Sequence, residues 1–327
     1  MAAALSLAER GVGRTGNNPS VGCVIVKNGI VIGRGWTQSG GRPHAEAMAL
    51  AQAGAEARGS TVYVTLEPCA HVSQRGPACA QLLKEAGYHT YMVGKWHLGK
   101  APDKIPAARG FERDFTLLDG MGSYWDMTNM TALNHTSVFT EDGKYLTRLP
   151  KNYYATETYT DKLISLIDDG KKDGKPFFAF LSHQAPHDPY HLPKDWRNRH
   201  VGEYDKGWDM VRQERLKRQK ELGIIPENTQ LAERMWFVPD YSILAPATRA
   251  VIGKKMELYA GLVENMDYHI GRLIDHLKEI GEYENTIFIV FGDNGAEGTD
   301  LGAMIGGTPG TRDYLFFASK TQRVAPG

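Results

Sequence analysis

The pattern of apolar and polar positions predicts a run of short elements in the first quarter of the chain. Two apolar runs flank Asn28 and Gly29, and Asn-Gly in this setting is a strong hairpin signal because both residues tolerate a positive φ. An alanine-rich stretch predicts a helix that begins at His44. Helices and strands are expected in the order α-β-β-α-β-α, over residues 3–11, 21–26, 30–33, 44–57, 61–66 and 78–86.

Longer patterns predict a second α/β region further along the chain. Residues 249–280 carry apolar side chains at three- and four-residue intervals, which indicates a long helix with one apolar face. Residues 286–291 form a continuous apolar run that suits a strand buried on both faces of a parallel sheet. Asp293 and Asn294 follow its carboxyl end, where open α/β sheets carry their sites. Their oxygen atoms suit Ca²⁺ or Mg²⁺, but two ligands are too few for more than weak binding.

Composition and charge exclude some classes of function. The 327 residues are 42% hydrophobic and 23% charged, which is ordinary for a globular chain and long enough for two domains. The net charge of zero gives no electrostatic argument for binding nucleic acid or a membrane surface. No apolar run approaches the length of a membrane span. The first residues suit an amphipathic helix better than a signal peptide, so we expect a cytoplasmic protein.

The cysteines suggest a metal site. All three, Cys23, Cys69 and Cys79, fall in the first quarter, and the last two complete a His-x-Glu and Pro-Cys-x9-Cys pattern with His44. One imidazole and two thiolates give Zn²⁺ three ligands and leave the fourth tetrahedral position for water, as in a catalytic site. We therefore predict zinc bound by His44, Cys69 and Cys79. Cys23 lies mid-strand among apolar residues, and we expect it to be a core residue.

Glu46 is the candidate catalytic residue beside this zinc site. At the start of a helix it can reach water without binding the metal, and it can carry a proton from water to a departing amine. A helix N-terminus also stabilises thiolates and hydroxide through its free N–H groups. His-x-Glu alone carries no signal, and Pro-Cys with a second cysteine nearby also fits a buried pair. The combination in this order favours the zinc site.

Residues 18–26, 41–46 and 61–71 resemble the deaminase domain of the RibD family of riboflavin-biosynthesis proteins. The resemblance implies a cytidine-deaminase-like α/β/α fold and removal of an amino group from a diaminohydroxy-phosphoribosylamino-pyrimidine. By the family pattern, the zinc ligands are His44, Cys69 and Cys79. Glu46 is then the proton shuttle, and the substrate-binding residues are Asn18 and His71. The spacing between the two cysteines is one residue longer than is common, and the reductase domain that should follow is absent.

Residues from about 85 to 315 resemble an arylsulfatase of the alkaline-phosphatase-like superfamily. The matching stretches are residues 88–99, 110–115, 176–187, 204–208 and 291–298. The resemblance implies an α/β domain whose sulfate-contacting residues are Lys95, His97 and His187 and whose metal ligands are Asp293 and Asn294. For the histidines, a position at a solvated strand end is the alternative interpretation.

The sulfatase resemblance is incomplete. The family needs a first strand followed by an Asp-Asp pair, and a Cys-x-Pro-Ser-Arg motif whose cysteine becomes the formylglycine nucleophile; neither occurs in the chain. A later lysine that contacts the sulfate would come after residue 327. A vestigial site without a nucleophile should not hydrolyse sulfate esters, so we expect no arylsulfatase activity.

We interpret the chain as a chimera joined near residues 80–88. A zinc-dependent deaminase domain spans residues 1–87 and is followed by a partial sulfatase-like domain over 88–327. An extended deaminase domain would end at residue 94. The expected substrate is a phosphorylated pyrimidine, with no nucleic-acid or membrane partner. The alternatives are a sulfuric-ester hydrolase fragment with a foreign N-terminus, and a fusion product without function.

The sequence also predicts how the two parts meet. We expect residues 89–93 to become a fourth strand of the deaminase sheet, beside residues 61–66, because both families connect a helix to a parallel strand here. Residues 177–181 and 286–291 should then pair with each other and leave an apolar edge uncovered. The chain after residue 94 should therefore be less stable than the chain before it.

Overall fold

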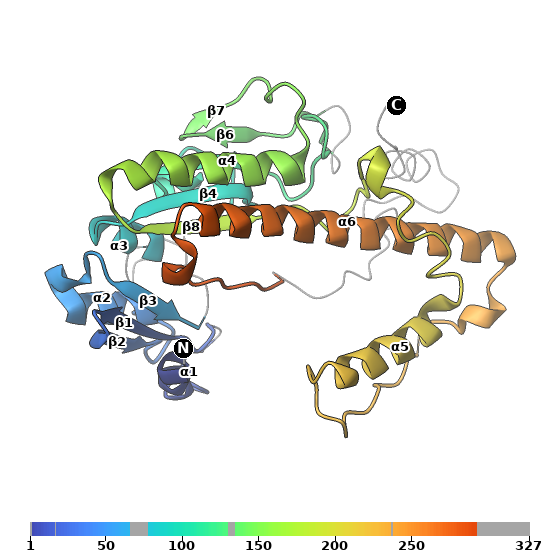
Figure 1. Ribbon diagram of the computed structural model, residues 1–327, viewed down its shortest axis with the longest axis horizontal. Helices are drawn as coiled ribbons and strands as arrows, with labels where there is room; N and C mark the ends of the chain where they lie inside the picture. The colour runs from blue at the N-terminus through green and yellow to red at the C-terminus, as the bar shows by residue number, and fades with distance from the viewer. Residues whose placement is uncertain (1, 17, 66–77, 130–134, 237, 293–327) are drawn as a thin grey trace.

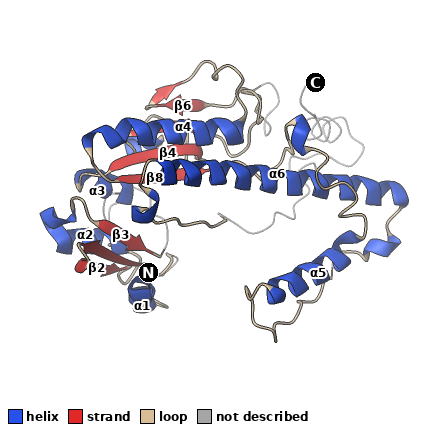
Figure 2. Cartoon of the chain, in the orientation of Figure 1, coloured by secondary structure: helices blue, strands red, loops and turns tan. Residues whose placement is uncertain are grey.

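The computed structural model describes residues 2–16, 18–65, 78–129, 135–236 and 238–292, without the side chain of Cys79. The molecule is a mixed α/β structure with two separate β-sheets (Figures 1 and 2). A three-stranded sheet is formed before residue 65 and a five-stranded sheet after residue 88.

The first sheet is antiparallel, with the strand order β2-β1-β3. Its strands are β1 (Gly22–Lys27), β2 (Ile30–Trp36) and β3 (Thr61–Val64). The predicted hairpin between β1 and β2 is confirmed, and Asn28 and Gly29 at its turn have φ values of 51° and 77°. Both residues therefore occupy the left-handed region that a tight hairpin turn requires.

Helices cover both faces of this sheet. Side chains of β1 alternate, so Val24 packs with α1 (Ala2–Glu9) while Cys23 and Ile25 pack with α2 (Ala45–Ala53) on the opposite face. Cys23 is fully buried, which confirms its prediction as a core residue. The predicted order α-β-β-α-β-α is also confirmed, because α3 (Cys79–Glu85) follows β3.

The second sheet has the order β7-β6-β5-β4-β8. Its parallel strands are β4 (His89–Lys95), β5 (Arg113–Leu117) and β8 (Phe177–Ser182), and the antiparallel edge is formed by β6 (Phe139–Glu141) and β7 (Lys144–Tyr145). The α4 helix (Ala155–Gly170) lies over β4 and β8, and α6 (Pro246–Glu279) packs beside α4 (Figure 1). The long helix predicted over residues 249–280 is therefore confirmed.

The described residues also contain the helix α5 (Gly207–Glu221). The short 3-10 helices among them are η1 (Gly54–Ala57), η2 (Pro106–Arg109), η3 (Lys171–Asp173), η4 (Lys194–Trp196), η5 (Tyr241–Ile243) and η6 (Tyr283–Asn285). None of the helices that the structure describes combines the length and the apolar character needed to cross a membrane.

The prediction that residues 89–93 join the first sheet is wrong. These residues belong to β4, which pairs in parallel with β5 on one side and with β8 on the other. Tyr91 and Val93 are buried toward α4, while Met92 is buried on the opposite face. A strand that is apolar on both faces is best accommodated in the middle of a sheet covered on both sides, and β4 occupies this position in the second sheet.

The predicted pairing of residues 177–181 with 286–291 is also wrong. The strand β8 pairs with β4 from His89↔Phe177 to Gly94↔Ser182, while residues 286–292 form no ladder with the described strands. The turn η3 returns the chain from α4 to the start of β4, where the Pro176 carbonyl accepts a hydrogen bond of 2.9 Å from the His89 amide. This short connection between α4 and β8 places β8 beside β4.

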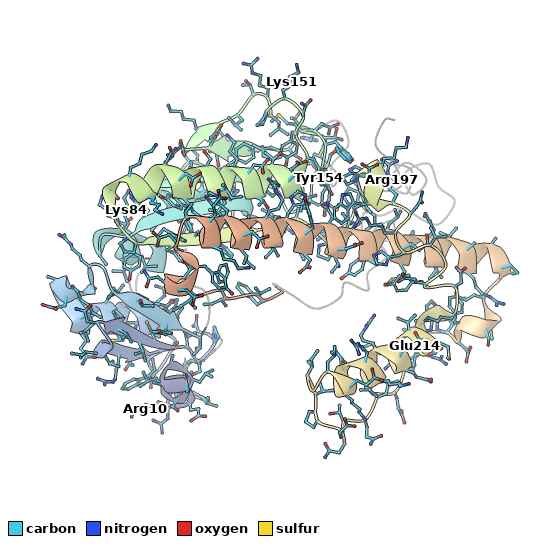
Figure 3. All side chains as sticks on the ribbon, viewed as in Figure 1. Arg10, Lys84, Lys151, Tyr154, Arg197 and Glu214 are labelled. Carbon is cyan, nitrogen blue, oxygen red and sulfur yellow. The ribbon has the colours of Figure 1, made fainter. Side chains whose placement is uncertain are left out.

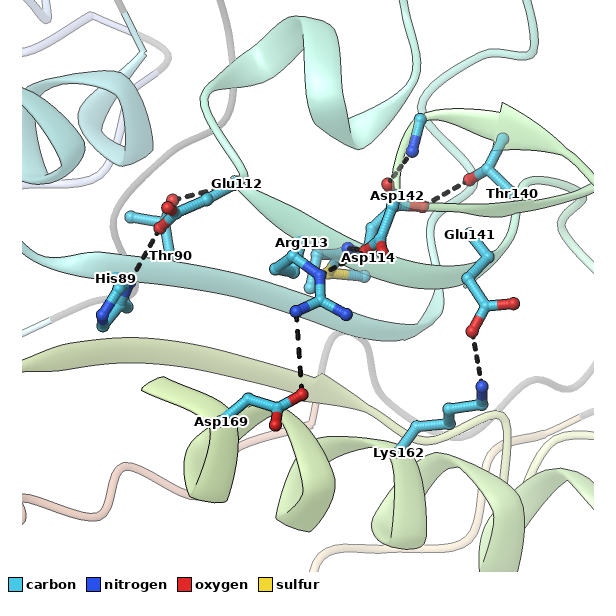
Figure 4. Close-up of polar contacts among 12 residues, drawn as sticks. His89, Thr90, Glu112, Arg113, Asp114, Thr140, Glu141, Asp142, Lys162 and Asp169 are labelled. Atoms are coloured by element: carbon cyan, nitrogen blue, oxygen red, sulfur yellow. Dashed lines mark hydrogen bonds and ion pairs between the residues drawn. The ribbon is translucent and has the colours of Figure 1, made fainter. Parts of the chain in front are cut away.

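Charged side chains tie the second sheet to neighbouring segments (Figure 4). His89 is bridged by two carboxylates: its Nδ1 lies 3.0 Å from Glu112 Oε2, and its Nε2 lies 3.0 Å from Asp173 Oδ1. Arg113 Nε donates to Asp142 Oδ1 at 2.8 Å. The His89 contacts link the start of β4 to the segments that precede β5 and β8, and the Arg113 contact links the start of β5 to the turn between β6 and β7.

Candidate functional site

Close packing of α2 on β2 positions His44 and Glu46. A Cβ placed on Gly35 would lie 2.1 Å from the Ala45 carbonyl oxygen, and one on Gly33 would lie 2.3 Å from that of Ala49. Only glycine allows the helix to approach the strand this closely. The first turn of α2 is thus held directly against the sheet.

His44 is the N-cap residue of α2, and its backbone is extended with φ −71° and ψ 163°. Glu46 lies in the first helical turn and is only 2% exposed. Burial, and then the nearby charge of Glu46, raise the pKa of the Cys23 thiol in β1. The carboxylate is therefore close to the sheet, and the helix N-terminus provides a favourable environment for its charge.

Asn18 lies beside the loop that leads to His44. A Cβ on Gly41 would be 2.0 Å from the Asn18 side-chain nitrogen, so the amide packs directly on the Gly41 backbone. The Asn18 carbonyl accepts a hydrogen bond of 2.5 Å from the Thr15 hydroxyl, which holds this turn. The structure thus brings Asn18 to the segment that precedes His44 and Glu46.

The other predicted zinc ligands are only partly described. Cys79 is the first residue of α3, so its backbone is at a helix N-terminus like that of His44. Cys69 and His71 lie outside the described residues. Within the part of the chain that is described, no three His, Cys, Asp or Glu side chains gather as a metal site. One imidazole and two thiolates remain a donor set that suits Zn²⁺.

The predicted sulfate-contacting residues lie at the carboxyl ends of the parallel strands. Lys95 ends β4, and His97 follows with a left-handed φ of 53°. The His97 ring lies against the Gly120 backbone after β5, because a Cβ there would be 2.4 Å from its Nε2. His187 follows β8. Asp293 and Asn294 lie outside the described residues.

His187 and Lys95 are close enough to influence each other. His187 Nδ1 lies 3.0 Å from Asp188 Oδ1, and this contact raises the pKa of His187 although burial and the charge of Lys95 oppose it. The Asp188 carboxylate thus favours the charged form of this imidazole, and the Lys95 ammonium group opposes it.

Two residues at this edge escaped prediction from the sequence. Asp188 holds the His187 imidazole, and its position directly after that histidine is a signal that could have identified it. His183 follows β8, and neither ring nitrogen has a hydrogen-bond partner among the described residues. Burial, together with His269, lowers the pKa of His183 to about 3, so its ring is neutral. Nothing in its local sequence signals this burial.

Comparison with known proteins gives two kinds of similarity. The sulfatase family model matches residues 25–319. An uncharacterized sulfatase of Schizosaccharomyces pombe is 38% identical over 250 residues, which cover 72% of this chain and 43% of that protein. An arylsulfatase of Klebsiella aerogenes is 35% identical over 227 residues, covering 69% of this chain and 48% of the relative. The chain thus spans less than half the length of these two relatives.

The riboflavin-biosynthesis protein RibD of Haemophilus influenzae is 59% identical over 87 residues, which cover 27% of this chain and 23% of that protein. This match is shorter than either sulfatase match, but its sequence identity is higher. The chain is therefore similar to members of two families, as the chimera interpretation predicts.

Proposed function

The chain belongs to the sulfatase family, whose model matches residues 25–319, and we propose that its first quarter, which is similar to RibD, is a zinc-dependent hydrolytic deaminase. In this proposal the deaminase domain spans residues 1–87, and the sulfatase-like domain spans 88–327. The substrate is a phosphorylated diaminohydroxy-pyrimidine. The observation that carries the proposal is the buried Glu46 carboxylate in the first turn of α2, two residues after His44.

Glu46 moves the proton in this reaction. Water supplies the oxygen that replaces the amino group, the C–N bond breaks, and Glu46 carries the proton from water to the departing ammonia. Burial at 2% exposure protects the carboxylate from solvent, and the packing of α2 on Gly35 fixes its position. His44, Cys69 and Cys79 would hold zinc, which supplies Lewis acidity when bound. Asn18 would hydrogen-bond the pyrimidine, since its amide can both donate and accept.

Release of ammonia from the phosphorylated diaminohydroxy-pyrimidine tests the proposal. The purified full chain should turn over this substrate, and Glu46→Gln should reduce turnover by about 10²- to 10⁴-fold because it removes general acid–base catalysis. Glu56→Gln is the matched control, since Glu56 is an exposed glutamate in the nearby η1. No ammonia release by the unaltered protein, or equal turnover by the Glu46 and Glu56 variants, would refute the assignment.

Metal analysis tests the ligand set separately. The full chain should purify with one zinc ion, and a Cys69→Ser, Cys79→Ser double variant should lose it because it removes two thiolate ligands. Glu46→Gln should retain zinc, since this residue is outside the ligand set. Equal zinc content in the double variant and the unaltered protein would contradict the assignment.

A sulfuric-ester hydrolase is the second candidate function. The family match over residues 25–319 favours it and does not support the expectation that sulfatase activity is absent. The position of Lys95 near His187, at the carboxyl ends of the parallel strands, also favours a sulfuric-ester hydrolase. Hydrolysis of a chromogenic aryl sulfate that is lost in Lys95→Ala would establish this function, whereas no hydrolysis by the unaltered protein would exclude it.

A further inference from the structure

A hollow of about 500 Å³ opens between the start of α4, the short helix η4 and the middle of α6. Its size lies within the range of small-molecule sites, roughly 300–1,000 Å³. Among its lining residues are Glu157, Asp195, Trp196, Asn265, Tyr268 and His269. None of these residues belongs to the zinc site or to the sulfate-contacting set.

The inner part of the hollow presents an unsatisfied amide donor. Asn265 on α6 is 1% exposed, and its Oδ1 accepts a hydrogen bond of 3.2 Å from the Tyr154 hydroxyl at the start of α4. Tyr154 lies between these two helices in Figure 3, and its hydroxyl has a second acceptor, the His191 carbonyl oxygen, at 3.3 Å. The Asn265 Nδ2 is buried without an acceptor in the described part of the chain. A ligand oxygen would relieve the cost of that burial.

His269 supplies a second donor one turn further along α6. Its Nδ1 lies 3.0 Å from Arg272 Nη1, and because a guanidinium only donates, the imidazole proton must be on Nε2. Burial, and then the charge of Arg272, lower the pKa of His269 to about 4, so the ring is neutral near pH 7. His269 and Asn265, which both line the hollow, therefore each carry an uncharged N–H donor.

Aromatic rings form part of the wall. The ring centroids of Trp196 and Tyr268 are 5.4 Å apart with an interplanar angle of 54°. The Arg199 guanidinium lies over the Trp196 ring at 3.7 Å and donates to Glu264 at 2.7 Å. Because the Arg199 guanidinium already stacks on this face of Trp196, that ring face is not available to a ligand cation.

The mouth carries acceptors. Glu157 and Asp195 are exposed, and in the described structure their carboxylates form no ion pair or hydrogen bond. Two negative charges disfavour an anionic ligand, whereas hydroxyl groups can donate to them. The hollow thus combines uncharged donors inside, carboxylate acceptors outside and aromatic surface between them.

We propose that this hollow binds a pyranose ring of an uncharged saccharide. A pyranose has an apolar C–H face that packs on Tyr268, and adjacent hydroxyl groups that each donate and accept hydrogen bonds. Its oxygens accept from Asn265 Nδ2 and His269 Nε2, while its hydroxyls donate to Asp195 and Glu157. This chemistry is independent of the proposed deaminase.

The test uses the full chain and three simple probes: methyl β-D-glucopyranoside, methyl β-D-galactopyranoside and methyl α-D-mannopyranoside. Saturation-transfer NMR should detect saturable millimolar binding of at least one of them. Asn265→Leu should weaken that binding at least about tenfold, since it removes the buried donor. Tyr268→Ala should do the same, and because Tyr268 is 54% exposed this variant leaves the core intact.

Tyr259→Ala is the matched control, because Tyr259 lies on the same helix, is 37% exposed and is outside the hollow. Its affinity for the glycoside should equal that of the unaltered chain. The proposal is overturned if no glycoside binds, or if Tyr268→Ala and Tyr259→Ala bind equally well. It is also overturned if choline binds in a Tyr268-dependent manner while the glycosides do not.

Discussion

Replacing Gly94 by alanine tests the position of β4 in the second sheet. A Cβ on Gly94 would lie 1.9 Å from the Ser182 carbonyl oxygen, and real Cβ atoms essentially never approach closer than 3.0 Å. The strands β4 and β8 would have to separate by 3.0 − 1.9 = 1.1 Å at this point. Gly94 also has a φ of 117°, which side-chain-bearing residues rarely adopt.

The magnitude follows from these two effects. The backbone strain costs about 1–3 kcal/mol, and loss of one or two ladder hydrogen bonds costs about 1 kcal/mol each. We therefore expect Gly94→Ala to lower the free energy of unfolding by about 2–5 kcal/mol, a large fraction of the stability of a typical domain. Urea unfolding followed by tryptophan fluorescence measures this change from the midpoint and slope.

Gly174→Ala is the control for this experiment. Gly174 also has a positive φ, of 70°, but no atom lies within 4 Å of a Cβ placed there. Its substitution should cost only about 1–2 kcal/mol of conformational strain. If Gly94→Ala destabilises the protein no more than Gly174→Ala does, then β4 and β8 are not neighbours in this register.

Two further predictions concern stability. Burial alone would lower the pKa of His89, but its hydrogen bonds to Glu112 and Asp173 outweigh burial and raise it. The stabilisation by His89 over His89→Gln should therefore be complete below the unfolded pKa of about 6.5 and decline as pH rises through the folded pKa; a pH-independent difference in urea midpoint would contradict this. Leu163→Ala, at a residue 1% exposed in the core, should cost about 2–5 kcal/mol in the same assay.

The sequence predicts those features whose causes are local. The β1–β2 hairpin depends on Asn28 and Gly29 alone, and the start of α2 at His44 follows from a helical pattern and its flanking loop. Glu46 could be identified because its proposed role depends on a separation of two residues from His44. These elements need no information from distant parts of the chain.

Strand partners and the hollow depend on distant residues. The β4 strand is apolar on both faces, so its sequence fits any buried strand, and its neighbours come from β5 and β8. Asn265 and His269 follow the helical pattern of α6 without distinction. The burial of the Asn265 amide depends on its packing against Tyr154, which is 111 residues away in the sequence.

Every described ladder lies wholly on one side of the turn between α3 and β4. The strands β1 to β3 pair among themselves before residue 65, and β4 to β8 pair among themselves after residue 88. A genetic crossover at this turn therefore splits no pair of neighbouring strands, so neither sheet has to find a new register. Such an exchange would have to re-create the hydrogen bond from the Tyr88 hydroxyl to the Ser60 carbonyl and the packing of Ala80 in α3 with Met92 of the second sheet. For protein engineering, a crossover at this turn leaves every described strand pair intact.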